Sequence, residues 1–259
     1  MKLAIRYLLY RIFAPHRKGF GVHSPFVYYL DSNVFTRKDD ENLKQISVWR
    51  NRLLKDRSKI LTSDIGSGSR VHISRNRIIK QITRKSSIRH KYGRILYALA
   101  REFKPGTIIE LGTGIGVSTV YLAKACPGSR VITIDGDGEK MKFAAKELEQ
   151  MQLGNVSFMQ GLFSEVLASV LPSAVHPVML FVDGDHSYEG TMEYYSQIKK
   201  KANHGTLVIF DDIRWSPGME KAWKEVIKDH KAVLSIDLFF IGIIFFRAGV
   251  PKQDFVINF

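Results

Sequence analysis

The chain has 259 residues, enough for one large domain or for one domain with a substantial extension. Hydrophobic residues make up 45% of it and charged residues 25%, a composition that excludes a disordered or fibrous protein. Cys126 is the single cysteine, so no intramolecular disulfide can form. We expect Cys126 to be a small buried side chain rather than a reactive thiol.

The formal net charge of +14 is concentrated in the first part of the chain. Residues 1–104 hold 24 Lys and Arg against 7 Asp and Glu, whereas the remaining residues hold 15 against 18. This asymmetry suggests an anionic partner, which could be nucleic acid, a membrane surface or an acidic substrate. A solvated basic surface is an equally good explanation.

Residues 1–18 predict a short basic helix. Arg6 and Arg11 interrupt the apolar run, no small-residue cleavage site follows, and the run is far shorter than a membrane-spanning helix. The apolar side chains at helical spacing are Leu3, Ile5, Leu8, Leu9, Ile12 and Phe13. Such a helix more often packs on its own domain, but it can also lie on a membrane surface as a peripheral contact. We expect a cytoplasmic protein.

Residues 1–88 are predicted to form a basic, mainly helical extension on the substrate side, and residues 89–259 the main domain. Two irregular loops in the extension, residues 21–26 and 64–70, carry no chemistry that the sequence identifies. Apolar residues recur at helical spacing over Tyr92–Phe103, which predicts a helix ahead of the first strand of the main domain.

The main domain alternates apolar, β-rich runs with amphipathic helical stretches, which is typical of a doubly wound α/β sheet. The predicted strands are Thr107–Leu111, Arg130–Ile134, Val156–Gln160, Val178–Val182, Thr206–Phe210, Ala232–Asp237 and Ile241–Arg247. The predicted helices between them are Ser118–Ala125, Gly138–Met151, Thr191–Lys201 and Met219–Asp229. The last two strands are too close in sequence for a crossover helix, so we expect them to form an antiparallel hairpin.

A glycine-rich turn follows the first predicted strand. The sequence Gly112-Thr-Gly-Ile-Gly116 stands between Leu111 and a predicted helix. Because glycines permit a tight turn and let a ligand approach the backbone, this strand, turn and helix predict a nucleotide-binding element. The candidate cofactor-binding residues of the turn are Gly112, Thr113, Gly114, Gly116 and Ser118.

Two carboxylates narrow the choice of ligand. Glu110 stands ahead of the glycines, where a negative charge would repel a pyrophosphate but suits the cationic S-adenosylmethionine. Asp135 ends the second strand about 20 residues beyond the glycines, in position to accept hydrogen bonds from two ribose hydroxyls. A nicotinamide-dinucleotide site with an irregular glycine spacing stays open as an alternative.

These motifs resemble those of the class I S-adenosylmethionine-dependent methyltransferases. Ile109–Ser118 is similar to the first motif of that family, and Val131–Asp135 to the second. Gly161 and Phe163 stand where the adenine-side contacts of the family lie, and Ser87–Gly93 where its methionine end is approached. The resemblance implies a Rossmann-like sheet of seven strands whose last strand is antiparallel, which agrees with the predicted terminal hairpin.

Carboxylates gather at the ends of the fourth and fifth predicted strands. Asp183 follows one strand, and Asp211 and Asp212 follow the other, with no basic residue beside them in the sequence. Adjacent carboxyl ends would bring the three close together, where they would repel one another strongly. A divalent cation would relieve that repulsion, and an all-oxygen ligand set favours Mg²⁺.

This pattern resembles the cation-dependent O-methyltransferases of the catechol and caffeoyl-coenzyme A type and the macrocin-type sugar O-methyltransferases. The resemblance makes Asp183, Asp211 and Asp212 the metal ligands, with Asp183 also near the cofactor. The catechol-type enzymes place a lysine base three residues after the first ligand, where this chain has His186. His186 and Asp183 are therefore the candidate catalytic residues, since a histidine can also take a proton near neutral pH. Two alternatives stay open: His186 orients the substrate or another residue, and the aspartates only contact the cofactor (Asp183) or cap the following loop (Asp211 and Asp212).

The sequence thus predicts metal-assisted O-methylation of a small hydroxylated acceptor, phenolic or sugar-like, with Trp215 and Tyr188 as candidate pocket residues. Two other classes stay open. One is a nucleic-acid methyltransferase that binds phosphates through its basic segment. The other is a non-catalytic protein that binds the cofactor or a membrane surface. A homodimer is compatible with each of them.

Overall fold

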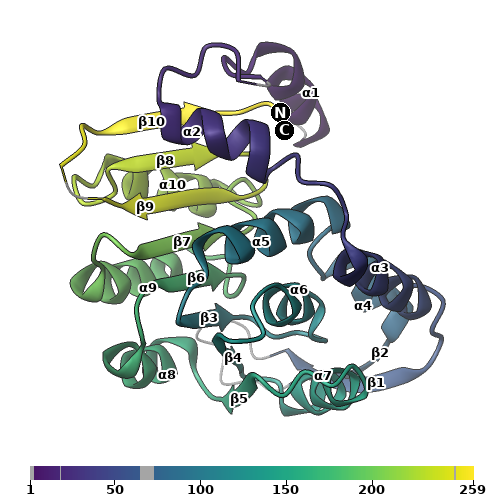
Figure 1. Cartoon of the computed structure of the whole chain (residues 1–259). Helices are drawn as coiled ribbons and strands as arrows, with labels where there is room; N and C mark the ends of the chain where they lie inside the picture. The colour runs from purple at the N-terminus through teal and green to yellow at the C-terminus, as the bar shows by residue number, and fades with distance from the viewer. Residues whose placement is uncertain (1–2, 18, 65–72, 248) are drawn as a thin grey trace.

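The computed structural model describes residues 3–17, 19–64, 73–247 and 249–259 (Figure 1). All but the first residue of the predicted loop over 64–70 therefore lies outside the described residues. The centre of the fold is one large sheet of eight strands. These are β3 (Thr107–Leu111), β4 (Arg130–Asp135), β5 (Val156–Gln160), β6 (Val178–Val182), β7 (Thr206–Phe210), β8 (Leu234–Asp237), β9 (Gly242–Phe246) and β10 (Gln253–Val256).

The strand order across the sheet is β10-β8-β9-β7-β6-β3-β4-β5. Strand β9 runs antiparallel to both of its neighbours, and every other neighbouring pair is parallel. The predicted α/β class is confirmed, as are the seven predicted strands and the antiparallel seventh. The sheet nevertheless has eight strands rather than seven, because the unpredicted β10 pairs with β8 at the edge.

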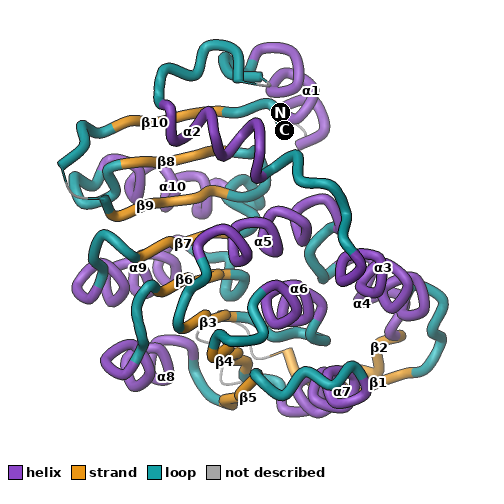
Figure 2. Tube along the Cα trace, viewed as in Figure 1, coloured by secondary structure: helices purple, strands orange, loops and turns teal. Residues whose placement is uncertain are grey.

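Helices cover both faces of this sheet (Figures 1 and 2). One face packs against α5 (His90–Phe103), α6 (Val117–Ala125) and α7 (Gly138–Gln150). The other face packs against α8 (Phe163–Val170), α9 (Tyr188–Lys201) and α10 (Pro217–Lys228). A 3₁₀ turn, η2 (Leu171–Ser173), follows α8. Successive residues of a strand point to opposite faces, so Ile108 joins the first core and Ile109 the second. Strands β3, β6 and β7 are buried along their whole length, as continuous apolar runs predict.

The chain ahead of this domain is mainly helical, as predicted. Its helices are α1 (Leu3–Phe13), α2 (Pro25–Tyr29), the π-helical turn η1 (Leu30–Val34), α3 (Glu41–Leu53) and α4 (Ile79–Lys85). Two antiparallel strands that were not predicted, β1 (Lys59–Asp64) and β2 (Ile73–Ile78), form a small separate sheet. Val27, Ile46 and Leu53 of this segment share one hydrophobic core with Leu96 of α5. None of the helices in the described part of the chain is long and apolar enough to cross a membrane.

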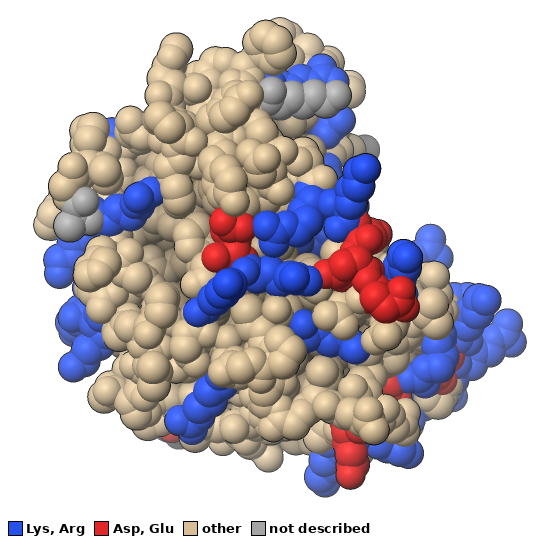
Figure 3. All heavy atoms as spheres, viewed as in Figure 1, with Lys and Arg blue, Asp and Glu red and all other residues tan. Residues whose placement is uncertain are grey.

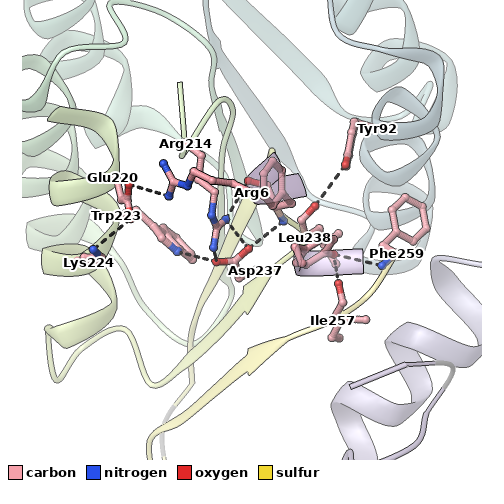
Figure 4. A network of polar contacts seen from close by, with 12 residues as sticks. Arg6, Tyr92, Arg214, Glu220, Trp223, Lys224, Asp237, Leu238, Ile257 and Phe259 are labelled. Carbon is pink, nitrogen blue, oxygen red and sulfur yellow. Dashed lines mark hydrogen bonds and ion pairs between the residues drawn. The ribbon is translucent and has the colours of Figure 1, made fainter. Parts of the chain in front are cut away.

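The two ends of the chain lie side by side (Figure 1). Tyr10 of α1 donates a hydrogen bond to the Ile257 carbonyl, and Arg6 pairs with Glu220 of α10 at 2.8 Å. A second set of contacts centres on the buried Asp237, as Figure 4 shows.

Asp237 accepts two hydrogen bonds from Arg214, at 2.7 and 2.6 Å, and a weaker one from the Trp223 indole at 3.3 Å. Its Oδ1 also accepts the backbone N–H of Phe239 at 2.8 Å. Tyr92 of α5 donates to the Leu238 carbonyl at 3.3 Å. These bonds fix the loop between β8 and β9, of which Phe240 lines the cavity described below.

Candidate functional site

A cavity of about 560 Å³ opens at the carboxyl ends of the central strands. This volume is typical of a small-molecule site, and ligands of open α/β sheets bind at this edge. Its wall contains these residues of the predicted site: Gly112, Thr113, Gly114, Ser118, Asp135, Phe163, Asp183, His186, Asp211 and Asp212. Three other predicted residues, Glu110, Gly116 and Gly161, do not line it.

The glycine turn after β3 has a backbone that other residues could adopt only with strain. Gly112 has φ of +105°, and a Cβ there would lie 2.1 Å from the Asp183 carbonyl oxygen. Gly114 has φ of +51° and faces open space, with its N–H donating to Asp135 Oδ2 at 2.8 Å. A Cβ on Gly116 would lie 3.0 Å from the Ala144 Cβ, so this glycine lets α6 begin close to α7. The turn is therefore packed on one side and open to the cavity on the other.

Glu110 supports this turn from behind the cavity wall. The side chain is fully buried, and Oε2 accepts hydrogen bonds from Thr119 at 2.5 Å and Thr133 at 2.6 Å. Burial raises the pKa of Glu110 to about 7, although the hydroxyls of Ser118, Thr119 and Thr133 oppose the shift. Glu110 thus links β3, β4 and α6, and it does not line the cavity.

Asp135 lines the cavity next to the glycine turn. Besides the Gly114 N–H, its carboxylate accepts the N–H of Asp137 at 2.9 Å. Burial raises the pKa of Asp135, and the nearby Lys140, which also lines the cavity, opposes that shift. Each carboxylate oxygen keeps a further lone pair, so two more donors such as ribose hydroxyls can be accepted.

Phe163 supplies an apolar wall on the same side of the cavity. A Cβ on Gly184 would lie 2.3 Å from its ring, which explains why a glycine stands between Asp183 and Asp185. The Phe163 ring also meets the Tyr194 ring edge to face, with centroids 6.0 Å apart. Gly161, predicted beside it, instead lies against Val166.

The three predicted carboxylates come together at the ends of β6 and β7. These strands are neighbours, with Val182 opposite Phe210. Burial is the main cause that raises the pKa of each carboxyl group, with mutual repulsion second for Asp183 and Asp211. The pKa of Asp211 rises to about 7, and that of Asp183 rises well above its usual value. Among the described residues, however, no group of three His, Cys, Asp or Glu side chains is arranged to hold a metal ion.

A cation missed by the sequence analysis lies beside these carboxylates. Arg89 directly precedes α5, lines the cavity and lies over the Phe240 ring, 4.5 Å from its centroid. Its charge lowers the pKa of both Asp211 and Asp212, against the effect of burial. The carboxylates, which have no basic residue beside them in the sequence, are therefore compensated in part by Arg89, which the fold brings to them from a distant part of the chain.

His186 lies next to Asp183, with Nε2 at 3.5 Å from Oδ1. Burial lowers the pKa of His186, while the charges of Asp212 and Asp185 oppose that shift. Because lowering the pKa favours the neutral imidazole, the ring can accept a proton near neutral pH.

The two aromatic candidates differ in their placement. Trp215 lies on the rim of the cavity and is 65% exposed. Tyr188 points to α10, where its hydroxyl donates to Glu225 at 2.6 Å, so it is not part of the pocket. The small buried side chain expected for Cys126 is confirmed: its thiol donates to the Ala100 carbonyl at 2.9 Å.

The mostly parallel sheet, with helices on both faces and a cavity at the carboxyl ends of its central strands, is a Rossmann-like fold. Residues 109–213 match a family described as "Methyltransferase domain". The O-methyltransferase TomG of Streptomyces achromogenes, whose structure holds S-adenosylmethionine, has the same fold, with a TM-score of 0.55 at 19% identity over 85% of this chain and 94% of that one. The predicted resemblance to class I methyltransferases is confirmed.

Among curated proteins, the catechol O-methyltransferase of Niastella koreensis is 28% identical over 130 residues, which are 49% of this chain. The chain spans 58% of the length of that relative. A ribosomal RNA small subunit methyltransferase G of Stenotrophomonas maltophilia is 40% identical, but over only 50 residues, or 24% of its length. The similarity to the catechol O-methyltransferase is therefore the more extensive one.

Proposed function

We propose that this protein transfers a methyl group from S-adenosylmethionine to a hydroxyl oxygen of a small acceptor, phenolic or sugar-like. One observation carries the proposal: a single cavity has the glycine turn and Asp135 on one side and the three carboxylates with His186 on the other. The methyl donor and the acceptor would therefore bind in the same cavity, as direct transfer of a methyl group between them requires.

The cofactor side supports binding through the backbone and one carboxylate. Gly114 exposes its backbone to the cavity, and Asp135 keeps lone pairs for the two ribose hydroxyls. Phe163 offers an apolar surface on which a flat base can lie. Asp183, at the neighbouring strand end, is the carboxylate that would face a positively charged donor group.

The acceptor side supports proton removal. His186, kept neutral by burial, would take the proton of the acceptor hydroxyl at Nε2. Arg89 would hold the acceptor through its remaining donors, since the guanidinium lies on the same wall as the carboxylates. Trp215 would close over an aromatic or sugar ring at the rim of the cavity.

The carboxylate oxygens of these aspartates also fit a divalent cation, with Mg²⁺ the best match. Asp211 is buried and Asp183 half-buried, and the two are in contact with each other and destabilised by their repulsion, which a cation would relieve. They would hold the ion, with Asp212 as the third ligand. When bound, such an ion supplies the positive charge that lowers the pKa of an acceptor hydroxyl.

The test is transfer of radiolabelled methyl groups to a panel of catechols and sugars, with Mg²⁺ or with excess chelator. We expect labelled product with Mg²⁺, a loss of at least about 100-fold in chelator, and a similar loss in Asp211→Asn. Asp56→Asn, outside the cavity, is the matched control. Full activity in chelator would overturn the metal assignment, and label in ribosomal RNA rather than the small acceptors would favour a nucleic-acid methyltransferase.

A further inference from the structure

The outward face of helix α1 is apolar. Five side chains at helical spacing point to solvent with exposed fractions between 39% and 72%: Ile5, Leu8, Leu9, Ile12 and Phe13. The loop that follows adds Phe20, which is 81% exposed. A surface helix ordinarily turns its apolar residues toward the core and its polar residues outward, so this arrangement needs a partner.

Packing on the domain does not account for this face, because other residues of α1 do the packing. Tyr7 meets Phe239 and Phe240 with ring centroids 5.0 and 5.6 Å apart, and Tyr10 is buried. Arg6 is paired with Glu220. The inward side of α1 is therefore already in contact with the domain, and the outward stripe is additional apolar surface.

The charge around the stripe selects an anionic partner. Residues 1–30 contain five Lys and Arg but no Asp or Glu, and Arg11 and Arg17 are exposed. The upper part of Figure 3, where α1 lies, shows blue but no red atoms. An apolar stripe with the exposed Arg11 and Arg17 beside it matches the interface of an anionic lipid bilayer, where acyl chains lie below negative headgroups.

The helix also lies at the cavity. Leu3 of α1 lines it, together with Arg84 and Lys85 at the end of α4 and the exposed Trp215 on the rim. Cations and an exposed indole at the mouth of the cavity are side chains that favour a headgroup layer. A surface that contacts α1 is therefore close to the entrance of the cavity.

We propose that α1 lies in the plane of an anionic membrane and presents the mouth of the cavity to it. The methyl acceptor is then an amphiphilic hydroxylated molecule held in the bilayer, a statement about substrate that rests on the proposed function. The membrane contact itself does not depend on catalysis.

Vesicle co-sedimentation of the full chain tests the contact, with phosphatidylcholine vesicles that contain or lack phosphatidylglycerol. We expect binding to the anionic vesicles that weakens at high salt. The combined change Leu8→Glu and Ile12→Glu removes two exposed apolar side chains and should lower vesicle affinity about 100-fold. Val48→Glu with Val175→Glu, at residues 72% and 64% exposed elsewhere, is the matched control and should bind as the wild type does. Circular dichroism and S-adenosylhomocysteine binding check that each variant is folded.

Equal binding by wild type and the α1 variant, or no binding at all, would overturn the membrane contact. A lipid-free dimer in sedimentation velocity that the α1 variant abolishes, without vesicle binding, would assign the stripe to a second copy instead. For the acceptor, we compare methyl transfer to a long-chain alkyl catechol in vesicles with transfer to its short-chain analogue. Methyl transfer to the short-chain analogue by a protein that does not bind vesicles would refute the membrane contact but not the proposed function. Vesicle binding without methyl transfer to either catechol would refute the proposed function but not the membrane contact.

Discussion

Gly114 offers a sharp test of the cofactor site, because its replacement separates ligand binding from folding. An added Cβ meets no atom within 4 Å, and the residue lines the cavity. The φ of +51° is a left-handed conformation that costs a non-glycine residue about 1 kcal/mol. For a domain of this size, that cost lowers the melting temperature by about 2–4 °C. Gly114→Ala should therefore fold, while its new methyl group projects into the space assigned to the cofactor.

Two further glycines make the comparison quantitative. Gly112→Ala brings a Cβ within 2.1 Å of the Asp183 carbonyl oxygen, a backbone clash that should cost about 3 kcal/mol or more. Gly128→Ala places its Cβ in open space outside the cavity, so it should change neither stability nor binding. Thermal unfolding and calorimetric titration with S-adenosylhomocysteine measure both quantities for each variant.

We expect Gly114→Ala to bind S-adenosylhomocysteine at least about tenfold more weakly than the wild type, a loss of about 1.4 kcal/mol. Gly112→Ala should be the least stable of the three variants. If Gly114→Ala binds with wild-type affinity, the turn after β3 does not hold the cofactor and the assignment is refuted.

Three other predictions concern the carboxylates and His186. Burial raises the pKa of Glu110 to about 7, so the folded state keeps its proton to higher pH than the unfolded state, and the free energy of unfolding falls as pH rises from about 4.5 to about 7. In Glu110→Gln, the free energy of unfolding should fall by about 3 kcal/mol less than in the wild type over this pH range. Urea denaturation of the cofactor-free protein at several pH values measures this difference. An unchanged pH dependence in the variant would contradict the raised pKa of Glu110. Asp211→Asn should raise the free energy of unfolding at about pH 8 by about 2 kcal/mol, because it removes a charge that burial and repulsion destabilise, while methyl transfer is lost. A less stable variant would show that the charged form of Asp211 is not destabilised in the folded protein. His186→Gln should lower kcat about 100-fold without changing the KM for S-adenosylmethionine. Because burial lowers the pKa of His186, the rate of methyl transfer by the wild type should rise with pH below about 6.5. If His186→Gln shows the same dependence of rate on pH, His186 is not the base.

The parts of the fold that sequence predicts well are those with a strong local signal. Strands β3, β6 and β7 are continuous apolar runs, and the glycine turn stands directly behind the first of them. Helices α9 and α10 begin earlier than predicted, at Tyr188 and Pro217. Ser187 and Ser216 cap these helices, and a serine before a helical stretch, with a proline next to Ser216, is a signal that could have placed both starts.

Other features depend on contacts between distant segments and leave little trace in the sequence. Strand β10 spans only Gln253–Val256, and its pairing with β8 decides its conformation. Arg89 becomes the counter-charge of Asp211 only because α5 starts beside the ends of β6 and β7. Glu110 matches a motif position whose identity is visible in the sequence, but its place behind the cavity wall follows from hydrogen bonds to Thr119 and Thr133.

The central claim is that one cavity holds the methyl donor beside the carboxylates. A crystal structure of the protein with S-adenosylhomocysteine tests it most directly. We predict the ribose hydroxyls on Asp135, the amino-acid end along the Gly112–Gly116 turn and the sulfur next to Asp183. A ligand bound outside this cavity, or inside it with its ribose away from Asp135, would contradict the claim.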